Sequence, residues 1–589
     1  MDELLIPNPA KNDVATYNIL VNDSAVDPTY KLLSLSIMKE ANRVPVAKII
    51  FSDGDAAQRN FEISNKADFI PGNRIQVNIG RDSKNKQAFK GIIVRHAVKV
   101  KTNGNSQLIV ECHDESVKMT IGRNSHYFEN VKDSQVFDEL IEKYKLKTDT
   151  QVTALKHKEL VQHHISDWDF LILRAEANGM LVFADDGVVK VVKPVIQPKE
   201  ALQVNYGSSV LEFESEIDAR SQWKNVHASS WDYSNQQLFK VDASSTALAE
   251  AGNISGSDIA DTISPENYEM HHSGHKLEQE LQDWADGQLL RSRLSKIRGR
   301  AKFIGYGDIR PGDTVKISGV SDRFNGKSYV TAVRQDIGGG IWETHIQFGL
   351  DPGRYAYHHK DIDDAPSSGL VGAIHGLQIG IAVKLESDPD GQDRILVKVP
   401  VIDNNAQGIW TRVACLDAGA GRGSFFRPEI GDEVIVGFIN DDPRDAVLLG
   451  MLNSSNKPAP ITAKDANDEK GFTTRSKMHI SFNDQTKTIK IDTPAGNSIT
   501  LDEQGMKIEI TDQNQNKLTM QPTGISLESQ KNIDIKAGTV LTLSAGVSLS
   551  ISAPSLAVKA DADVSISGAT ANLAAQGPAV ISGLPVKIN

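Results

Sequence analysis

The strongest constraint on the fold is a repeat in the last hundred or so residues. From about residue 478, apolar residues come in i, i+2 pairs that are separated by polar or small residues. Two residues at that spacing lie on the same face of a β-strand. The pairs that begin at Ile525, Ile533, Leu541 and Leu549 recur every eight residues. A short fixed period of this kind predicts a stacked β-solenoid with one layer per repeat.

The same repeat predicts how many chains form the solenoid. Eight residues make about one strand and one turn, which is too short for a single chain to close a tube around an apolar core. Three chains that each supply one face per layer would close a triangular prism, so we predict an obligate homotrimer. A disordered or aggregation-prone tail is the alternative, and the constant register argues against it. The predicted trimer core is Ile525, Leu527, Ile533, Ile535, Leu541, Leu543, Leu549 and Ile551.

The residues before this tail predict a mainly β chain with an α+β portion. Residues 1–135 alternate β-branched and polar residues between Gly, Asp and Asn turns, which predicts a first β-barrel domain. A helix is expected at 134–146 with Ser134 as its N-cap, a second after Ser166, and a third at 276–297. The predicted domains are 1–135 (first barrel), 136–235 (α/β segment), 236–369 (loops over 236–275, a helix and a second barrel), 370–455 (OB-fold), 456–477 (linker) and 478–589 (spike).

A weak internal repeat links the two predicted barrels. The segment 69–80, FIPGNRIQVNIG, is echoed by 308–319, DIRPGDTVKISG, and each places Pro-Gly before a strand. An aromatic-x-Gly step follows each segment, at Phe89 to Gly91 and at Phe324 to Gly326. This pattern favours two related barrels, although Pro-Gly turns also recur by chance in β-proteins.

Composition excludes several classes of function. The 589 residues carry a formal net charge of -12, which argues against binding a nucleic-acid backbone. Two cysteines cannot form a disulfide framework, so stability is expected to come from packing and assembly. The N-terminus has neither a basic nor a long apolar region, and no run approaches the roughly 18 apolar residues of a membrane helix. We expect a chain made in the cytoplasm without a signal peptide.

Residues with catalytic or metal-binding side chains do not form a convincing site in the sequence. His271, His272 and His275 lack a nearby cysteine, and a solvated loop explains them better than a metal. Cys112, His113 and Asp114 are adjacent on a strand, so neighbours point to opposite faces and cannot form a nucleophile–base pair. Paired carboxylates such as those at 185–186, 363–364 and 441–442 suit turn capping. We predict no catalytic residues, no metal and no cofactor.

The segment 409–460 carries a resemblance to a known family. Its motifs are W-x-R-V at Trp410 to Val413, A-G-x-G-x-G at Ala418 to Gly423, and P-x-I-G-D-E-V at Pro428 to Val434. With G-F-x-x-D-D-P-R at Gly437 to Arg444, these resemble the OB domain of VgrG-type spike proteins of type VI secretion and of phage-tail-like contractile injection systems. The resemblance is looser at 167–186 and in the repeats.

This resemblance implies a structural function rather than catalysis. It implies a trimeric hub of two related barrels per chain on a hexameric inner tube and its baseplate, an OB-fold, and a β-helical needle that pierces a target membrane. It also implies a PAAR-like tip protein and effector cargo, and an injection particle that acts outside the cell. We expect the tip protein to dock on Leu584, Pro585, Val586, Lys587, Ile588 and Asn589. No lysozyme domain fits between the OB-fold and the needle, and no toxin follows the repeats. A β-helical polysaccharide-degrading enzyme and an adhesin fibre are the alternatives.

Overall fold

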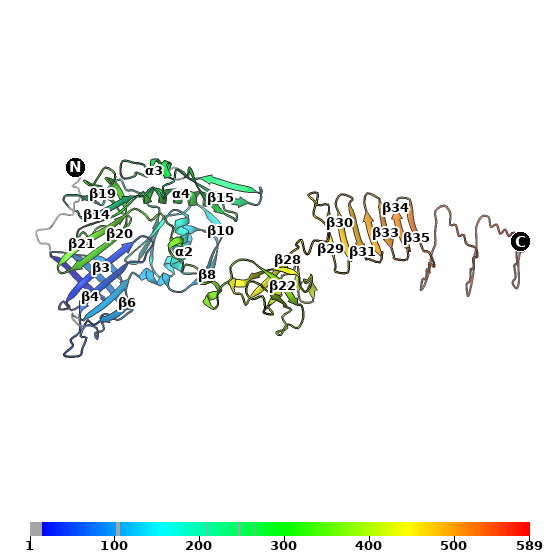
Figure 1. Cartoon of the computed structure of the whole chain (residues 1–589), viewed down its shortest axis with the longest axis horizontal. Helices are drawn as coiled ribbons and strands as arrows, with labels where there is room; N and C mark the ends of the chain where they lie inside the picture. The colour runs from blue at the N-terminus through cyan, green and yellow to red at the C-terminus, as the bar shows by residue number, and fades with distance from the viewer. Residues whose placement is uncertain (1–13, 102–105, 209, 245–247, 264, 589) are drawn as a thin grey trace. The chain divides into compact units, whose positions relative to one another are not determined.

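The structure, a computed structural model, describes residues 14–101, 106–208, 210–244, 248–263 and 265–588. The fold is mainly β, as the sequence predicts. The chain divides into two compact units, one ending at Gly450 and the other beginning at Met451 (Figure 1).

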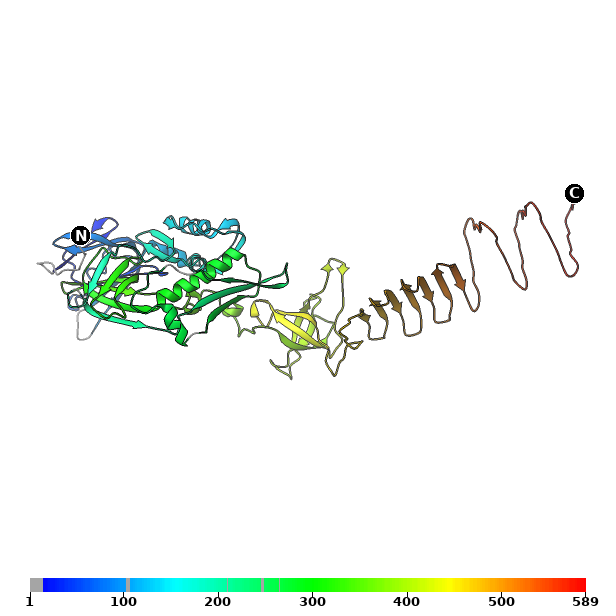
Figure 2. The ribbon, with the colours of Figure 1, turned by 90° about the horizontal axis from the view of Figure 1, so that it is seen from above.

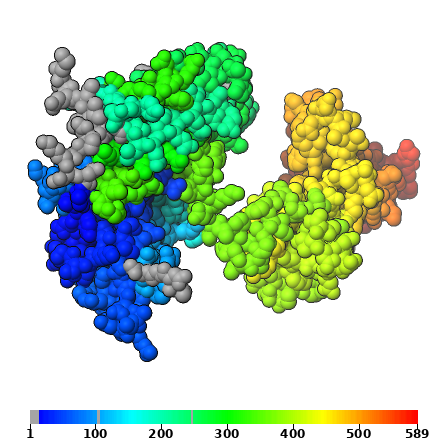
Figure 3. Space-filling view, turned by 60° about the vertical axis from the view of Figure 1, so that its left-hand side comes forward, coloured from blue at the N-terminus to red at the C-terminus, as the bar shows by residue number. Residues whose placement is uncertain are grey.

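The largest element of the first unit is a 13-stranded sheet made by two halves of a hub. Each half surrounds its own apolar core, centred on Phe51 and Phe89 in the first and on Phe303 and Phe348 in the second. The two halves lie against each other in the space-filling view (Figure 3). The first half contains β1 (Ala15–Val21), β2 (Ser24–Ala25), β3 (Leu32–Glu40), β4 (Val46–Ser52), β5 (Arg74–Arg81), β6 (Lys84–Lys99) and β7 (Gln107–His113). The second contains β13 (Leu202–Asn205), β14 (Val210–Ile217), β18 (Ile297–Ile304), β19 (Thr314–Ser318), β20 (Gly326–Gly338) and β21 (Ile341–Phe348).

Antiparallel pairing of β3 with β20 makes the two halves continuous. Met38 lies opposite Arg334, and the Ser36 hydroxyl donates a hydrogen bond of 2.6 Å to Asp336. The two predicted barrel domains therefore share one 13-stranded sheet.

An α/β segment with its own core follows the first half. Helix α2 begins after Ser166, whose hydroxyl oxygen accepts the Asp169 N–H at 3.0 Å, as the sequence predicts. Ser134, by contrast, lies inside α1, and the backbone N–H of the N-cap residue Lys132 donates to the side-chain oxygen of Gln135. The elements are η1 (Glu115–Thr120), β8 (Asn124–Lys132), α1 (Asp133–Glu142), β9 (Lys147–Thr150), β10 (Lys156–Ile165), α2 (Asp167–Ala177), β11 (Leu181–Asp185) and β12 (Val188–Val192).

The segment predicted as loops, 236–275, is more ordered than expected. It contains helix α3 and two strands, β16 and β17, which join β15 in a three-stranded sheet that packs on α4. The core of this sheet lies against α4, where Val226 and Met270 pack near Leu281. Part of that core comes from outside the segment, so the segment itself is poor in large apolar residues and its sequence favours loops. The elements are β15 (Asn225–Asp232), β16 (Gln237–Asp242), α3 (Gly256–Ile263), β17 (Asn267–His272) and α4 (Glu278–Ser295).

The predicted OB-fold is a closed five-stranded barrel, in the order β22-β23-β24-β28-β27. Its core contains Val397, Val434 and Leu448. The elements from the hub onward are α5 (Tyr355–His358), η2 (Pro366–Gly369), β22 (Gln378–Lys384), β23 (Ile395–Lys398), β24 (Ile409–Val413), β25 (Ala418–Gly419), β26 (Arg422–Gly423), β27 (Glu433–Phe438), η3 (Ile439–Asp441) and β28 (Ala446–Met451).

The second unit contains a seven-stranded antiparallel meander (Figure 2). Its first strand lies inside the predicted linker 456–477, because Phe472 pairs with Ile480 and extends the apolar pattern upstream. In the described chain from Ser529 to Ile588 no strand is assigned. The strands are β29 (Glu469–Thr473), β30 (His479–Asn483), β31 (Thr488–Asp492), β32 (Ser498–Asp502), β33 (Lys507–Thr511), β34 (Lys517–Gln521) and β35 (Gly524–Glu528).

Candidate assembly surfaces

One face of the meander is a continuous apolar surface. The i, i+2 pairs of successive strands lie directly opposite one another, with Ile480 across from Ile491 and Ile491 across from Ile499. Two strands and two turns span 19 residues, so Ile480, Ile499 and Leu518 occupy equivalent positions. Nine side chains of this face keep 39–44% of their surface exposed. They are Ile480, Phe482, Ile489, Ile491, Ile499, Leu501, Ile508, Ile510 and Met520.

The opposite face of the meander is polar and pairs its own charges. Lys507 and Lys517 lie 3.3 and 2.8 Å from Glu509, and the hydrogen bond from Lys517 helps to hold the pKa of Glu509 below its usual range. Lys490 lies 3.5 Å from Asp492. A sheet with one solvated and one apolar face normally has the apolar face covered, and within the described part of the second unit no segment covers it.

The predicted trimer-core residues lie at the end of the meander and beyond it. Ile525 and Leu527 belong to β35, and the other six follow it in the strand-free segment. All eight are exposed in the single chain. Among the predicted tip residues, Leu584, Val586 and Ile588 are also exposed, whereas Asn589 lies outside the described residues.

The two Pro-Gly turns of the hub have the same backbone geometry. The Gly72 and Gly312 residues adopt φ of 101° and 95°, which glycine tolerates best. Gly72 N–H donates to the Ile93 carbonyl and Ile93 N–H to the Asn73 carbonyl, at 2.8 and 2.9 Å. Gly312, Val330 and Asp313 repeat this exchange at 2.8 and 2.9 Å. The sequence repeat therefore corresponds to a structural repeat at these turns.

The aromatic-x-Gly steps are not equivalent in the structure. Gly91 lies within β6, two residues before Ile93, whereas Gly326 begins β20, four residues before Val330. That part of the predicted repeat is therefore a coincidence of composition.

The β11–β12 turn locks the hub together, which explains the carboxylate pair at 185–186. Asp186 accepts hydrogen bonds from the Lys90 N–H and the Gln87 side chain at 2.8 and 2.6 Å. Asp185 pairs with the buried Lys39 and, at 3.3 Å, with Arg310. These carboxylates thus join strands β3 and β6 to the second Pro-Gly turn. Their contacts account for the pair at 185–186 as a structural feature of the hub.

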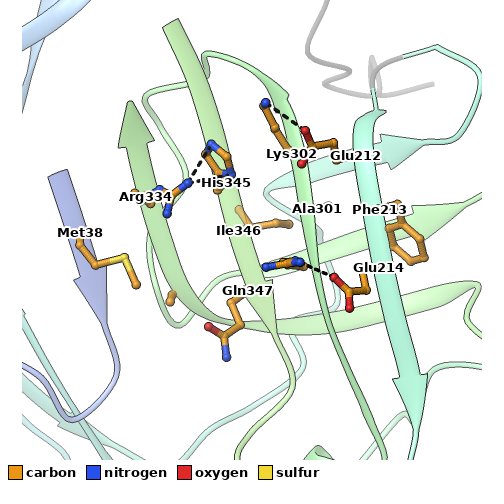
Figure 4. A pocket seen from close by; sticks show the side chains of 12 residues that line it. Met38, Glu212, Phe213, Glu214, Ala301, Lys302, Arg334, His345, Ile346 and Gln347 are labelled. Carbon is orange, nitrogen blue, oxygen red and sulfur yellow. Dashed lines mark hydrogen bonds and ion pairs between the residues drawn. The ribbon is translucent and has the colours of Figure 1, made fainter. Parts of the chain in front are cut away.

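A cavity of about 380 Å³ lies on the shared hub sheet, over β14, β18, β21, β20 and β3 (Figure 4). Its charged side chains pair across strands, including Lys302 with Glu212 and Arg300 with Glu214. Burial lowers the pKa of His345, which lies beside Arg334. The charges that line the cavity are therefore largely neutralised by neighbouring strands.

The cysteine and histidines with potentially catalytic or metal-binding side chains each contact a separate partner. Cys112 is buried, and burial raises the pKa of its thiol, while His113 contacts Glu111 at 3.2 Å. His271 contacts the Ser229 hydroxyl, and the ring of His275 lies 5.1 Å from that of Tyr233 at a tilt of 56°. Among the described residues, no three His, Cys, Asp or Glu side chains form a group that could hold a metal. No helix in the described ranges is long and apolar enough to cross a bilayer.

Comparison with known families identifies the chain. The profile of the Alg8 N-terminal domain family matches residues 11–339, more than half of the chain. The chain belongs to this family. The type VI secretion system/phage-baseplate injector OB domain matches residues 378–452, which coincide with the closed barrel.

A curated relative agrees with the OB-domain match. The type VI secretion system spike protein VgrG3 of Vibrio cholerae is 31% identical over 93 residues, 15% of this chain and 9% of that protein. The match therefore spans about a tenth of that relative. Together, the OB-domain match and the VgrG3 match confirm the predicted resemblance of this chain to VgrG-type spike proteins.

Solved structures give weaker likenesses. A 43 kDa prophage MuSo2 tail protein from Shewanella oneidensis has a TM-score of 0.44 at 10% identity, covering 57% of this chain and 98% of that one. The Escherichia coli c3393 protein, a type VI secretion component, has a TM-score of 0.36 at 12% identity, covering 74% and 99%. TM-scores below 0.5 are too low to assign a shared fold over the whole chain.

Proposed function

We propose that the chain is the homotrimeric hub and spike of a contractile injection system. The observation that carries this proposal is the apolar face of the meander, with its constant 19-residue register. Whatever covers a face with that repeat must present a matching repeat along the same length. A second and third copy of the same chain satisfy this requirement, and three such sheets close an apolar prism.

The hub would connect the needle to a tube of higher symmetry. Each chain carries two copies of the Pro-Gly turn, so three chains would present six. Six equivalent turns match a hexameric inner tube, with baseplate proteins around it. The OB-fold would join this ring to the needle, which would transmit axial force into a target membrane.

The strand-free segment 529–588 would complete the needle between copies. Its backbone donors and acceptors need partners, and strands of the other two chains can supply them. A PAAR-like protein would cover the needle end at 584–589, and effectors could travel with the spike. No cofactor, nucleic acid or catalytic step enters this proposal.

The composition of native particles tests the proposal. Injection particles purified from the producing bacterium should contain three copies of this chain for each six copies of one tube-protein ring at the spike end, as counted by cryo-electron microscopy. Deleting residues 584–589 should leave the trimer intact and remove a small tip protein. Particles that form normally without the chain, or turnover of peptidoglycan that depends on Asp441 and Asp442, would contradict the proposal.

A further inference from the structure

The loop between β24 and β27 exposes the most prominent apolar side chains of the OB domain. Leu416 is 93% exposed and Phe425 is 87% exposed, and Phe426 and Ile430 are also exposed. Figure 2 shows the β25–β26 hairpin of this loop standing out from the barrel. Large apolar side chains at such exposure are typical of a surface that binds another protein.

Contacts within the loop hold it in this extended form. Arg422 donates from one guanidinium nitrogen to both carboxylate oxygens of Asp417, at 2.6 and 2.8 Å. The Ser424 N–H donates to the Asp417 carbonyl at 2.8 Å. Gly423 has φ of +133°, and a Cβ there would lie 2.4 Å from that same carbonyl oxygen, so only glycine fits. The loop is therefore ordered before it meets a partner, which lowers the entropic cost of binding.

A second apolar surface lies on the outer wall of the same barrel. Ile379 of β22 lies opposite Ile435 of β27, and Leu377 and Leu449 flank Gly437. Ile379, Leu377 and Leu449 are exposed, while alternate residues of the same strands fill the barrel core. Strands that are apolar on both faces are usually covered on both faces.

We infer that loop 414–432 of one copy docks on the outer wall of the OB barrel of the next copy, around a threefold axis. This inference rests on the proposed trimer. A threefold axis makes every contact heterologous, so a projecting element of one copy must meet a different surface of the next. Arg422 and Asp417 are paired with each other within the loop, its largest exposed side chains are apolar, and the wall is apolar as well. Three such contacts would hold the barrels in register where the needle begins.

The exposed Cys415, beside Leu416, allows a direct test. Two full-length chains are co-expressed with different affinity tags. One keeps Cys415, and the other carries Cys415→Ser with Ile379→Cys. Mixed trimers are isolated through both tags and treated with a short bifunctional maleimide, for which the buried Cys112 is inaccessible. A link can then form only between copies.

The inference predicts a covalent dimer that forms at least about tenfold faster than in a control, because docking holds the two thiols at millimolar effective concentration. The control replaces Ile379→Cys with Val401→Cys, which is 78% exposed on a different loop of the barrel. Adding Leu416→Ser and Phe425→Ser to the Cys415 chain should abolish the advantage.

Measuring the mass of each sample by light scattering separates two kinds of failure. A monomeric mass would reject the proposed trimer. A trimeric mass with equal linking rates at positions 379 and 401 would reject only the docking. Flotation of the wild-type protein with phospholipid vesicles, lost in Phe425→Ser, would assign the loop to a membrane and overturn the inference.

Discussion

Replacing one side chain at the middle of the meander's apolar face should dismantle the proposed trimer. Ile499 lies between Ile491 and Ile510 on the neighbouring strands, and 40% of its surface is exposed in the single chain. Ile499→Asp would place three carboxylates, one from each copy, around the proposed axis. Thr500→Asp is the matched control, because Thr500 is the next residue of β32 and belongs to the opposite, polar face.

The size of the effect follows from the exposed fractions. Full burial of such a side chain contributes roughly 1.5–3 kcal/mol, so covering the remaining two-fifths contributes about 1 kcal/mol for each of the nine side chains. Ile499→Asp loses about 1 kcal/mol of this per copy and adds a desolvation cost of several kcal/mol for each unpaired carboxylate. Over three copies the total exceeds about 8 kcal/mol, which lowers the association constant of the trimer by more than about five orders of magnitude.

Size-exclusion chromatography with light scattering measures this effect. At micromolar concentration the Ile499→Asp chain should elute as monomer or aggregate, and the Thr500→Asp chain as the wild-type trimer. Burial would raise the pKa of the introduced carboxylate in the trimer, so trimer should partly return as the pH falls below that raised value. A stable Ile499→Asp trimer at pH 7 would refute the assignment of this face to the core.

Three further predictions concern the first unit. Burial alone would raise the pKa of Asp133, but hydrogen bonds from His157 and Arg174 at 2.9 and 2.7 Å hold it well below the usual range. The depressed pKa stabilises the fold fully above about pH 4, and this contribution falls progressively as the pH drops from there toward the folded pKa. Asp133→Asn should therefore destabilise the fold in urea at pH 7 by about 2–4 kcal/mol, and by a smaller amount at pH 3; an equal loss at both pH values would contradict this. Arg123 donates to the backbone carbonyls of Asp361, Ile362 and Asp363, so Arg123→Ala should speed tryptic cleavage after Lys360 severalfold, and Lys118→Ala should not. Native protein should expose about one thiol per chain to a thiol reagent, with the second appearing only on unfolding, and two rapid thiols would contradict the burial of Cys112.

Periodicity predicted local structure well where one face of a strand or helix was apolar. The i, i+2 pairs up to Leu527 fall on β30 to β35, and Ser166 marks the start of α2. The eight-residue pairs from Ile533 onward fall in the segment where no strand is assigned. The sequence pattern does not predict β16 and β17, because α4, which comes later in the chain, supplies much of the core of their sheet. The sequence pattern of a strand shows how apolar its buried face is. Where another element supplies part of the core, that face needs fewer apolar residues and the pattern is weaker.

The apolar pattern of the sequence does not predict which strands pair with one another. An i, i+2 pair fixes which residues share a face, but not whether the next strand runs parallel or antiparallel. The 19-residue register of the meander therefore emerged only from the structure. Ser36 and Asp336 are 300 residues apart in the sequence, and nothing in either segment predicts that the two pair. The segment 414–432 carries the A-G-x-G-x-G motif in the sequence, but the exposure of its apolar side chains Leu416 and Phe425 is evident only in the structure.

The mass of the intact chain in solution tests the central claim most directly. Native mass spectrometry of the full-length protein at micromolar concentration should give a single species of about three times 64.2 kDa. That species should persist on tenfold dilution, because nine partly exposed apolar side chains per copy would be covered. A soluble species of 64.2 kDa under the same conditions would contradict the account.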